Sequence, residues 1–207
     1  MTTPVEVRLA ATVMLVRDGQ QGLETFMLKR NPRSEFVPGQ FVFPGGAVDV
    51  NDQLTHEVET VSSGLDDREA SKRLRIDSGG LAYWVAAIRE CFEEAGALLA
   101  RIDGEDLSLA DPQVLQRFQG HRNAIYAGDL TMMDLCRTEG LSLNFEDLRY
   151  VSHWITPIGP PRRFDTRFFV ARSPYGQRPA HDGGETVESC WICLLYTSDA
   201  ADEGLGV

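Results

Sequence analysis

The fold is decided by the stretch Arg89-Glu90-Cys91-Phe92-Glu93-Glu94-Ala95-Gly96-Ala97. It ends a longer segment, Leu81–Ala95, in which apolar residues recur at i, i+4, i+7 and i+11, the spacing of one helix face. Gly96 follows as a helix stop. At about 100° per residue, the three glutamates fall opposite that apolar face, within about one quadrant. The stretch therefore predicts an amphipathic helix that carries three clustered carboxylates.

Three glutamates on one helix face repel one another. At this spacing, each pair among Glu90, Glu93 and Glu94 costs roughly 0.2–0.5 kcal/mol. Seen alone, the three fit a solvated acidic face better than a site, although hard divalent cations do bind carboxylate oxygens. Two neighbouring features favour a Mg²⁺ or Mn²⁺ site. Arg89 can orient a carboxylate by a bidentate pair, and Phe43-Pro44-Gly45-Gly46 supplies flexible backbone that can offer a carbonyl to a metal.

The rest of the chain mixes predicted strands and helices. Upstream, we predict a strand over Val5–Val16, its hairpin partner over Thr25–Lys29, and a short strand over Gln40–Phe43 that stops at Pro44-Gly45-Gly46. Downstream, we predict a partly helical excursion over 50–78, two helical pieces over 111–139, and strands over Leu148–Ile155, Phe164–Ala171 and from Glu188 to Trp191. Composition and periodicity alone indicate a mixed α/β domain.

Composition narrows the class of protein. The 207 residues suit one domain, or one domain with an insertion. The net charge of −11 argues against a general nucleic-acid binder, whose surface would carry a basic patch. No apolar run approaches the length of about 18 residues that a membrane helix needs, and no secretory leader is evident, so we expect a cytoplasmic protein. Cys190 and Cys193 are interpreted as chance neighbours rather than half of a zinc site, because no second pair accompanies them.

The glycine-containing segment at Gly46 and the glutamate-rich segment Arg89–Ala97 together resemble the signature of the Nudix hydrolases. That signature, the Nudix box, is a glycine, five residues, a glutamate, seven residues, and then Arg-Glu-U-x-Glu-Glu-x-Gly-U, where U is apolar. Arg89–Ala97 matches the second half. Gly46 and Asp52 match the first half, with aspartate in place of the usual glutamate. Between Asp52 and Arg89 the chain carries 36 residues, so the box is split by an insertion of about 29 residues.

The split box is similar to that of the Nudix branch that includes the peroxisomal acyl-CoA diphosphatases. Two further runs resemble this branch: Met27–Gly46, which precedes the box as in CoA-cleaving enzymes, and Arg162–Phe169. The resemblance covers residues 8 to 191. It implies a metal-dependent hydrolase that cleaves CoA or acyl-CoA to 3′,5′-ADP and a phosphopantetheine product. The alternatives are hydrolysis of another nucleoside diphosphate linked to a second group, such as a dinucleotide or a nucleotide sugar, and a nucleotide-sensing module without catalysis.

The resemblance also implies roles for individual residues. Glu90, Glu93, Glu94 and the carbonyl of Gly46 would hold Mg²⁺ or Mn²⁺, and Arg89 would hold the glutamates in place. A bound metal lowers the pKa of a water, and a carboxylate accepts the proton of that water as it attacks phosphorus. Glu93, Glu94 and Glu185 are the candidates for this base, with Glu188 as the runner-up for Glu185. The aspartate at residue 52, in place of the usual glutamate, does little to weaken these assignments, because the first glutamate of the box is more often structural than catalytic.

Other side chains are candidates for contact with the substrate. Guanidinium groups pair with phosphate, which makes candidates of five arginines: Arg30, Arg33, Arg162, Arg163 and Arg167. Three aromatic side chains could stack on an adenine, although core packing is the better interpretation of each: Phe36, Phe41 and Trp154. For any one arginine, a place on the surface without function is at least as good an interpretation.

The expected fold is the Nudix α/β/α sandwich, with a mixed sheet and a helical insertion at about 53–81. We expect the Nudix hydrolase domain to span residues 1–192. The tail, 193–207, loses its periodicity, and we expect it to be non-native rather than simply frayed. The expected partner is a small-molecule nucleotide diphosphate, with no nucleic acid and no membrane, and a homodimer is a possible assembly.

Overall fold

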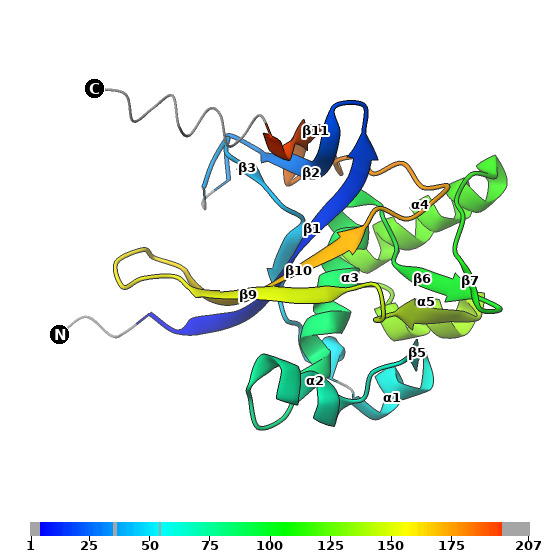
Figure 1. Cartoon of the computed structure of the whole chain (residues 1–207), viewed down its shortest axis with the longest axis horizontal. Helices are drawn as coiled ribbons and strands as arrows, with labels where there is room; N and C mark the ends of the chain where they lie inside the picture. The colour runs from blue at the N-terminus through cyan, green and yellow to red at the C-terminus, as the bar shows by residue number, and fades with distance from the viewer. Residues whose placement is uncertain (1–4, 35–36, 54, 196–207) are drawn as a thin grey trace.

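The main sheet is mixed, with parallel and antiparallel strands, and it positions the side chains of the candidate site. A computed structural model describes residues 5–34, 37–53 and 55–195. The strand order is β11-β2-β1-β10-β9 (Figure 1), built from β1 (Val7–Gly19), β2 (Gly22–Arg30), β9 (Arg149–Ile155), β10 (Arg163–Arg172) and β11 (Thr186–Cys193). β1 runs parallel to β10, whereas β2 is antiparallel to both β1 and β11. The short strands β3 (Phe41–Val42) and β4 (Gly45–Ala47) pair with β2 and β1.

Strand β1 separates the core from the site because its side chains alternate between two faces. Ala11, Val13 and Leu15 are fully buried on the face that packs against helix α3 (Leu81–Ala95). Arg8, Ala10 and Thr12 line a pocket on the other face. The helix has the predicted bounds, and its four periodic apolar residues are buried. It ends at Gly96, whose φ of 66° is left-handed and suits glycine.

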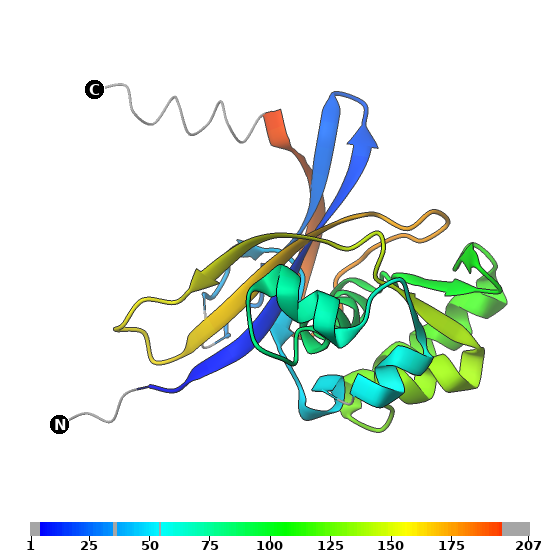
Figure 2. The same ribbon diagram turned by 60° about the horizontal axis from the view of Figure 1, so that its bottom comes forward.

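The insertion is partly helical, as predicted. It follows the 3-10 helix η1 (Val50–Gln53), which holds Asp52, and it contains α1 (Thr55–Thr60), the two-residue strand β5 (Ser62–Ser63) and α2 (Asp67–Leu74). Figure 2 brings α1 and α2 to the front, against α3. The carboxylate of Asp67 accepts hydrogen bonds from the backbone N–H groups of Gly79 and Leu81 (3.0 and 2.9 Å). The insertion therefore holds the start of α3.

A second, smaller sheet was not predicted. It has the order β5-β8-β6-β7, with β6 (Ala100–Ile102), β7 (Glu105–Asp106) and β8 (Leu141–Asn144). Its strands are too short for a period of two to emerge from the sequence. Between β7 and β8 lie α4 (Pro112–Ala127) and α5 (Met132–Glu139), which confirm the two predicted helical pieces. None of the helices that the structure describes has the length and apolar character needed to cross a membrane.

Two predicted boundaries are wrong. The short strand predicted over Gln40–Phe43 does stop before Pro44, but it covers only Phe41–Val42, and Gly45 begins a further strand, β4, that was not predicted. Gly45 lies against β1, where an added Cβ would be 2.5 Å from the carbonyl oxygen of Ala11. The last strand begins before Glu188 and continues through Cys193, which pairs with Glu24. The sheet thus includes the first residue of the segment 193–207, of which residues 196–207 lie outside the described part.

Candidate active site

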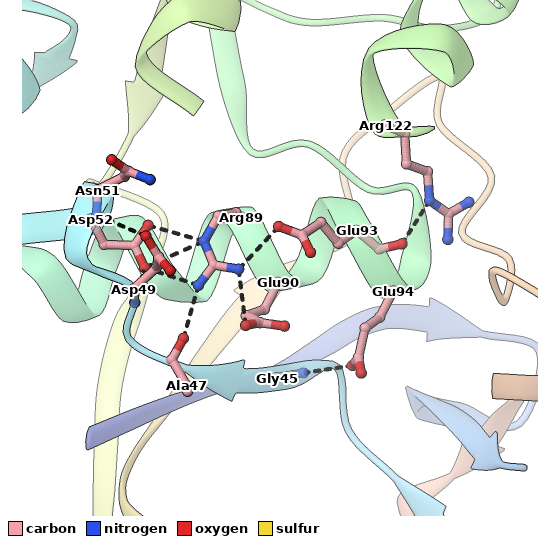
Figure 3. A network of polar contacts seen from close by, with 10 residues as sticks. All are labelled: Gly45, Ala47, Asp49, Asn51, Asp52, Arg89, Glu90, Glu93, Glu94 and Arg122. Carbon is pink, nitrogen blue, oxygen red and sulfur yellow. Dashed lines mark hydrogen bonds and ion pairs between the residues drawn. The ribbon is translucent and has the colours of Figure 1, made fainter. Parts of the chain in front are cut away.

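Arg89 is the centre of the polar network on α3 (Figure 3). It donates from Nε and Nη2 to the carboxylate of Asp52 (3.0 and 2.9 Å) and from Nη2 to the carbonyl oxygen of Ala47 (2.8 Å). Nη1 donates to Oε1 of Glu90 (2.9 Å) and to Oε1 of Glu93 (3.0 Å). One guanidinium therefore ties two carboxylates of the helix to η1 and β4.

Asp52 has a structural place in this network. It is 2% exposed, and its Oδ2 also accepts the backbone N–H of Asp49 (2.8 Å), which closes a tight turn at η1. The bidentate pair with Arg89 gives the buried carboxylate a charge-assisted partner. An aspartate can thus fill the box position that usually holds a glutamate.

Glu94 and Glu90 contact the strand that faces α3. Oε2 of Glu94 accepts the backbone N–H of Gly45 (2.9 Å), and the residue is 5% exposed. The carboxylate of Glu90 lies directly against Gly46, where an added Cβ would come within 2.5 Å of Oε1. Gly46 therefore provides the space that the Glu90 carboxylate occupies.

Burial makes the negative charge of these carboxylates unfavourable. It raises the pKa of Glu90 to about 7, against the lowering effect of Arg89. Burial also raises the pKa of Asp52 and Glu93, and it raises that of Glu94 well above the usual range, where the charge of Glu90 adds to the effect. For Arg89, burial lowers the pKa, but the hydrogen bond to Asp52 and the nearby carboxylates outweigh it. The site holds more negative charge than Arg89 can neutralise.

The donor chemistry fits a hard divalent cation. The buried carboxylate of Glu94, the partly buried carboxylates of Glu90 and Glu93, and the Gly46 backbone line the same pocket. Additional positive charge would relieve the penalty of burying these carboxylates. Within residues 5–34, 37–53 and 55–195, no three His, Cys, Asp or Glu side chains are grouped as a metal site in their present conformations. The structure thus brings the predicted ligands together without arranging them as a coordination shell.

Glu90, Glu93 and Glu94 form an acidic wall at one end of a pocket of about 650 Å³. Its floor is the outer face of β1 and β10, with Ala10, Thr12, Phe164 and Phe168. Residues of the 37–43 segment also line the pocket, including Phe41 and Phe43. The pocket therefore combines an acidic end with an aromatic surface.

Several of the predicted substrate contacts lie in this pocket. Arg30, Arg162, Phe41 and Glu185 line it together with the three glutamates and Gly46. Nη2 of Arg30 lies 4.0 Å from Oε2 of Glu185. Glu188, by contrast, pairs with Lys29 (3.0 Å) outside the pocket, so the geometry favours Glu185 over Glu188.

Other predicted contacts do not reach the pocket. Arg167 is 5% exposed and lies on the opposite face of β10, with its guanidinium over the ring of Tyr83, so its predicted role is corrected. Arg163 does not line the pocket, and its Nε donates to the carbonyl oxygen of Thr156 (3.0 Å). Arg33 and Trp154 are exposed outside it. Phe36 lies outside the described residues.

The structure adds residues that no sequence pattern indicated. Tyr126 of α4 lines the pocket beside the acidic wall. Arg122, on the same helix, donates to the carbonyl oxygens of Glu93 (2.8 Å) and Ala180 (3.3 Å). It thereby fixes the end of α3 to the chain segment that leads to Glu185. Only the packing of α4 against α3 brings these side chains to the site.

Comparisons with known proteins agree with this architecture. The family model of the NUDT19 Nudix domain matches residues 6–196. The acyl-coenzyme A diphosphatase NUDT19 of Xenopus laevis is 28% identical to this chain over 176 residues, which cover 71% of this chain and 46% of that protein. The human protein of the same name is 28% identical over 185 residues, which cover 72% of this chain and 48% of that protein. The chain therefore spans about half the length of these curated relatives.

A solved structure supports the fold. The crystal structure of a Nudix hydrolase from Alicyclobacillus acidocaldarius superposes with a TM-score of 0.71 at 26% sequence identity, covering 97% of this chain and 85% of that one. The predicted α/β class with a mixed sheet is thus confirmed. The split box, the acidic wall on α3 and the match over nearly the whole chain lead to one conclusion: the chain belongs to the family of the NUDT19 Nudix domain.

Proposed function

We propose that this chain is a metal-dependent Nudix hydrolase that cleaves the diphosphate bond of CoA or acyl-CoA to 3′,5′-ADP and a phosphopantetheine product. The observation that carries the proposal is the acidic wall of Glu90, Glu93 and Glu94 at one end of a pocket with arginines and aromatic rings. Guanidinium groups pair with phosphate, and rings can stack on a base. The curated relatives named above are acyl-coenzyme A diphosphatases, which supports the choice of substrate.

The proposed metal ligands are Glu90, Glu93, Glu94 and the carbonyl of Gly46. A bound Mg²⁺ or Mn²⁺ supplies charge neutralisation and a water of lowered pKa. Arg89 contributes by fixing Oε1 of Glu90 and Glu93, so that the carboxylates stay in place as substrate enters. The proton of the attacking water would pass to a carboxylate oxygen of Glu93, Glu94 or Glu185.

Arg30 is the proposed partner of the cleaved diphosphate. Its Nε is buried and has no hydrogen-bond partner among the described residues. A buried donor without a partner costs about 1–3 kcal/mol. Since Arg30 lines the pocket next to Glu185, the terminal nitrogens of its guanidinium, rather than the buried Nε, are the groups that would pair with a phosphate oxygen of the substrate.

Product analysis tests the proposed function directly. CoA incubated with the protein and Mg²⁺ is expected to give 3′,5′-ADP and 4′-phosphopantetheine, detected by chromatography and mass spectrometry. Removal of the metal with EDTA is expected to stop the reaction, and added Mg²⁺ to restore it. Intact CoA alongside cleavage of a dinucleotide or a nucleotide sugar would instead support the alternative substrates.

Gly46→Ala tests the space beside Glu90. The added methyl group would displace the Glu90 carboxylate, because its Cβ would come 2.5 Å from Oε1 of Glu90. We expect hydrolysis to fall by about 10- to 100-fold, the typical effect of disturbing the surroundings of metal ligands. Gly120→Ala in α4 is the matched control, because nothing lies within 4 Å of the position that its Cβ would take. Equal activity of the two variants would contradict the assigned role of Gly46.

A further inference from the structure

Arg8 is a basic residue of the pocket that the proposed chemistry does not use. It is the second residue of β1, it is exposed, and it lines the same pocket as the acidic wall. Across the described part of the chain, no side chain forms an ion pair or a hydrogen bond with its guanidinium. Arg30, in contrast, lies next to Glu185. Arg8 is thus a cationic group of the pocket that, unlike Arg30, has no carboxylate beside it among the described residues.

Arg8 stands well away from the carboxylates. Ala11, three residues further along β1, pairs with Gly46, and Gly46 contacts Glu90. A strand rises about 3.3 Å per residue, so Arg8 lies about 10 Å along β1 from the point where the strand passes the acidic wall. In Figure 1 the first part of β1 runs beside the turn between β9 and β10, away from α3. The two ends of the pocket therefore bear opposite charge.

The surface between these ends suits a nucleoside. Arg8 pairs in register with Phe164, and Ala10 pairs with Thr166. The small side chains of Ala10 and Thr12 leave room above the sheet, and Phe164 and Phe168 provide flat apolar surface beside them. Arg162, which precedes β10, adds a second guanidinium to the lining. A ligand that fills this space would place its diphosphate at the acidic wall, its base on the aromatic surface and a second anionic group at Arg8.

We propose that Arg8 recognises a second phosphate ester on the nucleoside half of the substrate, separate from the diphosphate that is cleaved. The inference rests on the proposed function and deepens it. Among substrates with a nucleoside diphosphate, those with a 3′-phosphate on the ribose, such as CoA, present a phosphate of this kind. Nucleotide sugars and dinucleotides without that group do not. Arg8 thus determines which nucleoside diphosphates the pocket selects.

The test compares CoA with 3′-dephospho-CoA, which differ only in this phosphate. The ratio of kcat/KM for the two substrates is measured for the wild type and for Arg8→Met, which keeps an apolar stem but removes the charge. We expect the wild type to prefer CoA and Arg8→Met to lose about 10- to 100-fold of that preference, the range expected for one hydrogen bond to a charged group. Arg68→Met, an exposed arginine of α2 outside the pocket, is expected to keep the wild-type ratio.

The outcomes separate the inference from the proposed function. If both substrates are cleaved and the ratio is the same in the wild type and Arg8→Met, the assignment of Arg8 is overturned while the diphosphatase proposal stands. If the wild type cleaves neither substrate, the proposed function fails, and binding of 3′,5′-ADP against 5′-ADP, measured by calorimetry, decides the role of Arg8. Tighter binding of 3′,5′-ADP that is lost in Arg8→Met supports the assignment, and any other pattern overturns it.

Discussion

Replacing Arg89 with methionine is expected to lower the free energy of unfolding by about 3–5 kcal/mol, the typical effect of removing one partner from a buried ion pair. Arg89 is the cation that Asp52, Glu90 and Glu93 share, and its side chain is 13% exposed. Without it, three largely buried carboxylates face one another with raised pKa values. Urea unfolding, followed by circular dichroism, measures the change.

Arg101→Met is the matched control for this prediction. Arg101 also pairs with three carboxylates, those of Asp106, Glu146 and Asp147, but all three are more than half exposed. Exposed pairs contribute about 0–1 kcal/mol each. Asp52→Asn added to Arg89→Met is expected to recover part of the loss, because it removes one of the stranded charges. Equal destabilisation by Arg89→Met and Arg101→Met would show that the network does not stabilise the fold.

The helix that carries the site could be predicted from the sequence, because α3 is long and strongly periodic. Its apolar spacing and the stop at Gly96 agree with the structure at both ends. The pairing of Asp52 with Arg89 could not be read from spacing, since 36 residues separate the two. Only the resemblance to the Nudix box placed them together. Periodicity thus accounts for single elements, and the contact between elements came from the motif.

The substrate pocket was harder to predict because its walls come from distant segments. A contact between Arg167 and the substrate is predicted from the sequence, yet Thr166 and Phe168 face the pocket. Because successive side chains of a strand point to opposite faces, Arg167 lies on the other side of β10. Strand β10 carries polar and large apolar side chains on both faces, and its sequence alone does not show which face is buried. Arg8 and Tyr126 gave no signal, because a single exposed arginine or tyrosine is ordinary on a protein surface.

Glu93→Gln and Glu94→Gln are expected to lower kcat for CoA by about 100-fold or more, within the range typical for loss of a general base or of charge at a metal site. Glutamine keeps the size of the side chain and one acceptor oxygen. It can still accept the hydrogen bond from Arg89 at residue 93 or from the backbone of Gly45 at residue 94. The polar contacts of the wall are therefore preserved while its negative charge is reduced.

Stability should respond to Glu94→Gln in the opposite sense to activity. Burial holds the pKa of Glu94 well above its usual range, so the charged carboxylate is disfavoured in the fold, and a neutral amide removes that penalty. We expect an unchanged or higher unfolding midpoint in urea for a variant that has lost its activity. Glu188→Gln, on β11 outside the pocket, is expected to change neither property. An active but destabilised Glu94→Gln protein would mean that this carboxylate serves the fold and not the chemistry, and the metal ligands would then have to be sought elsewhere in the pocket.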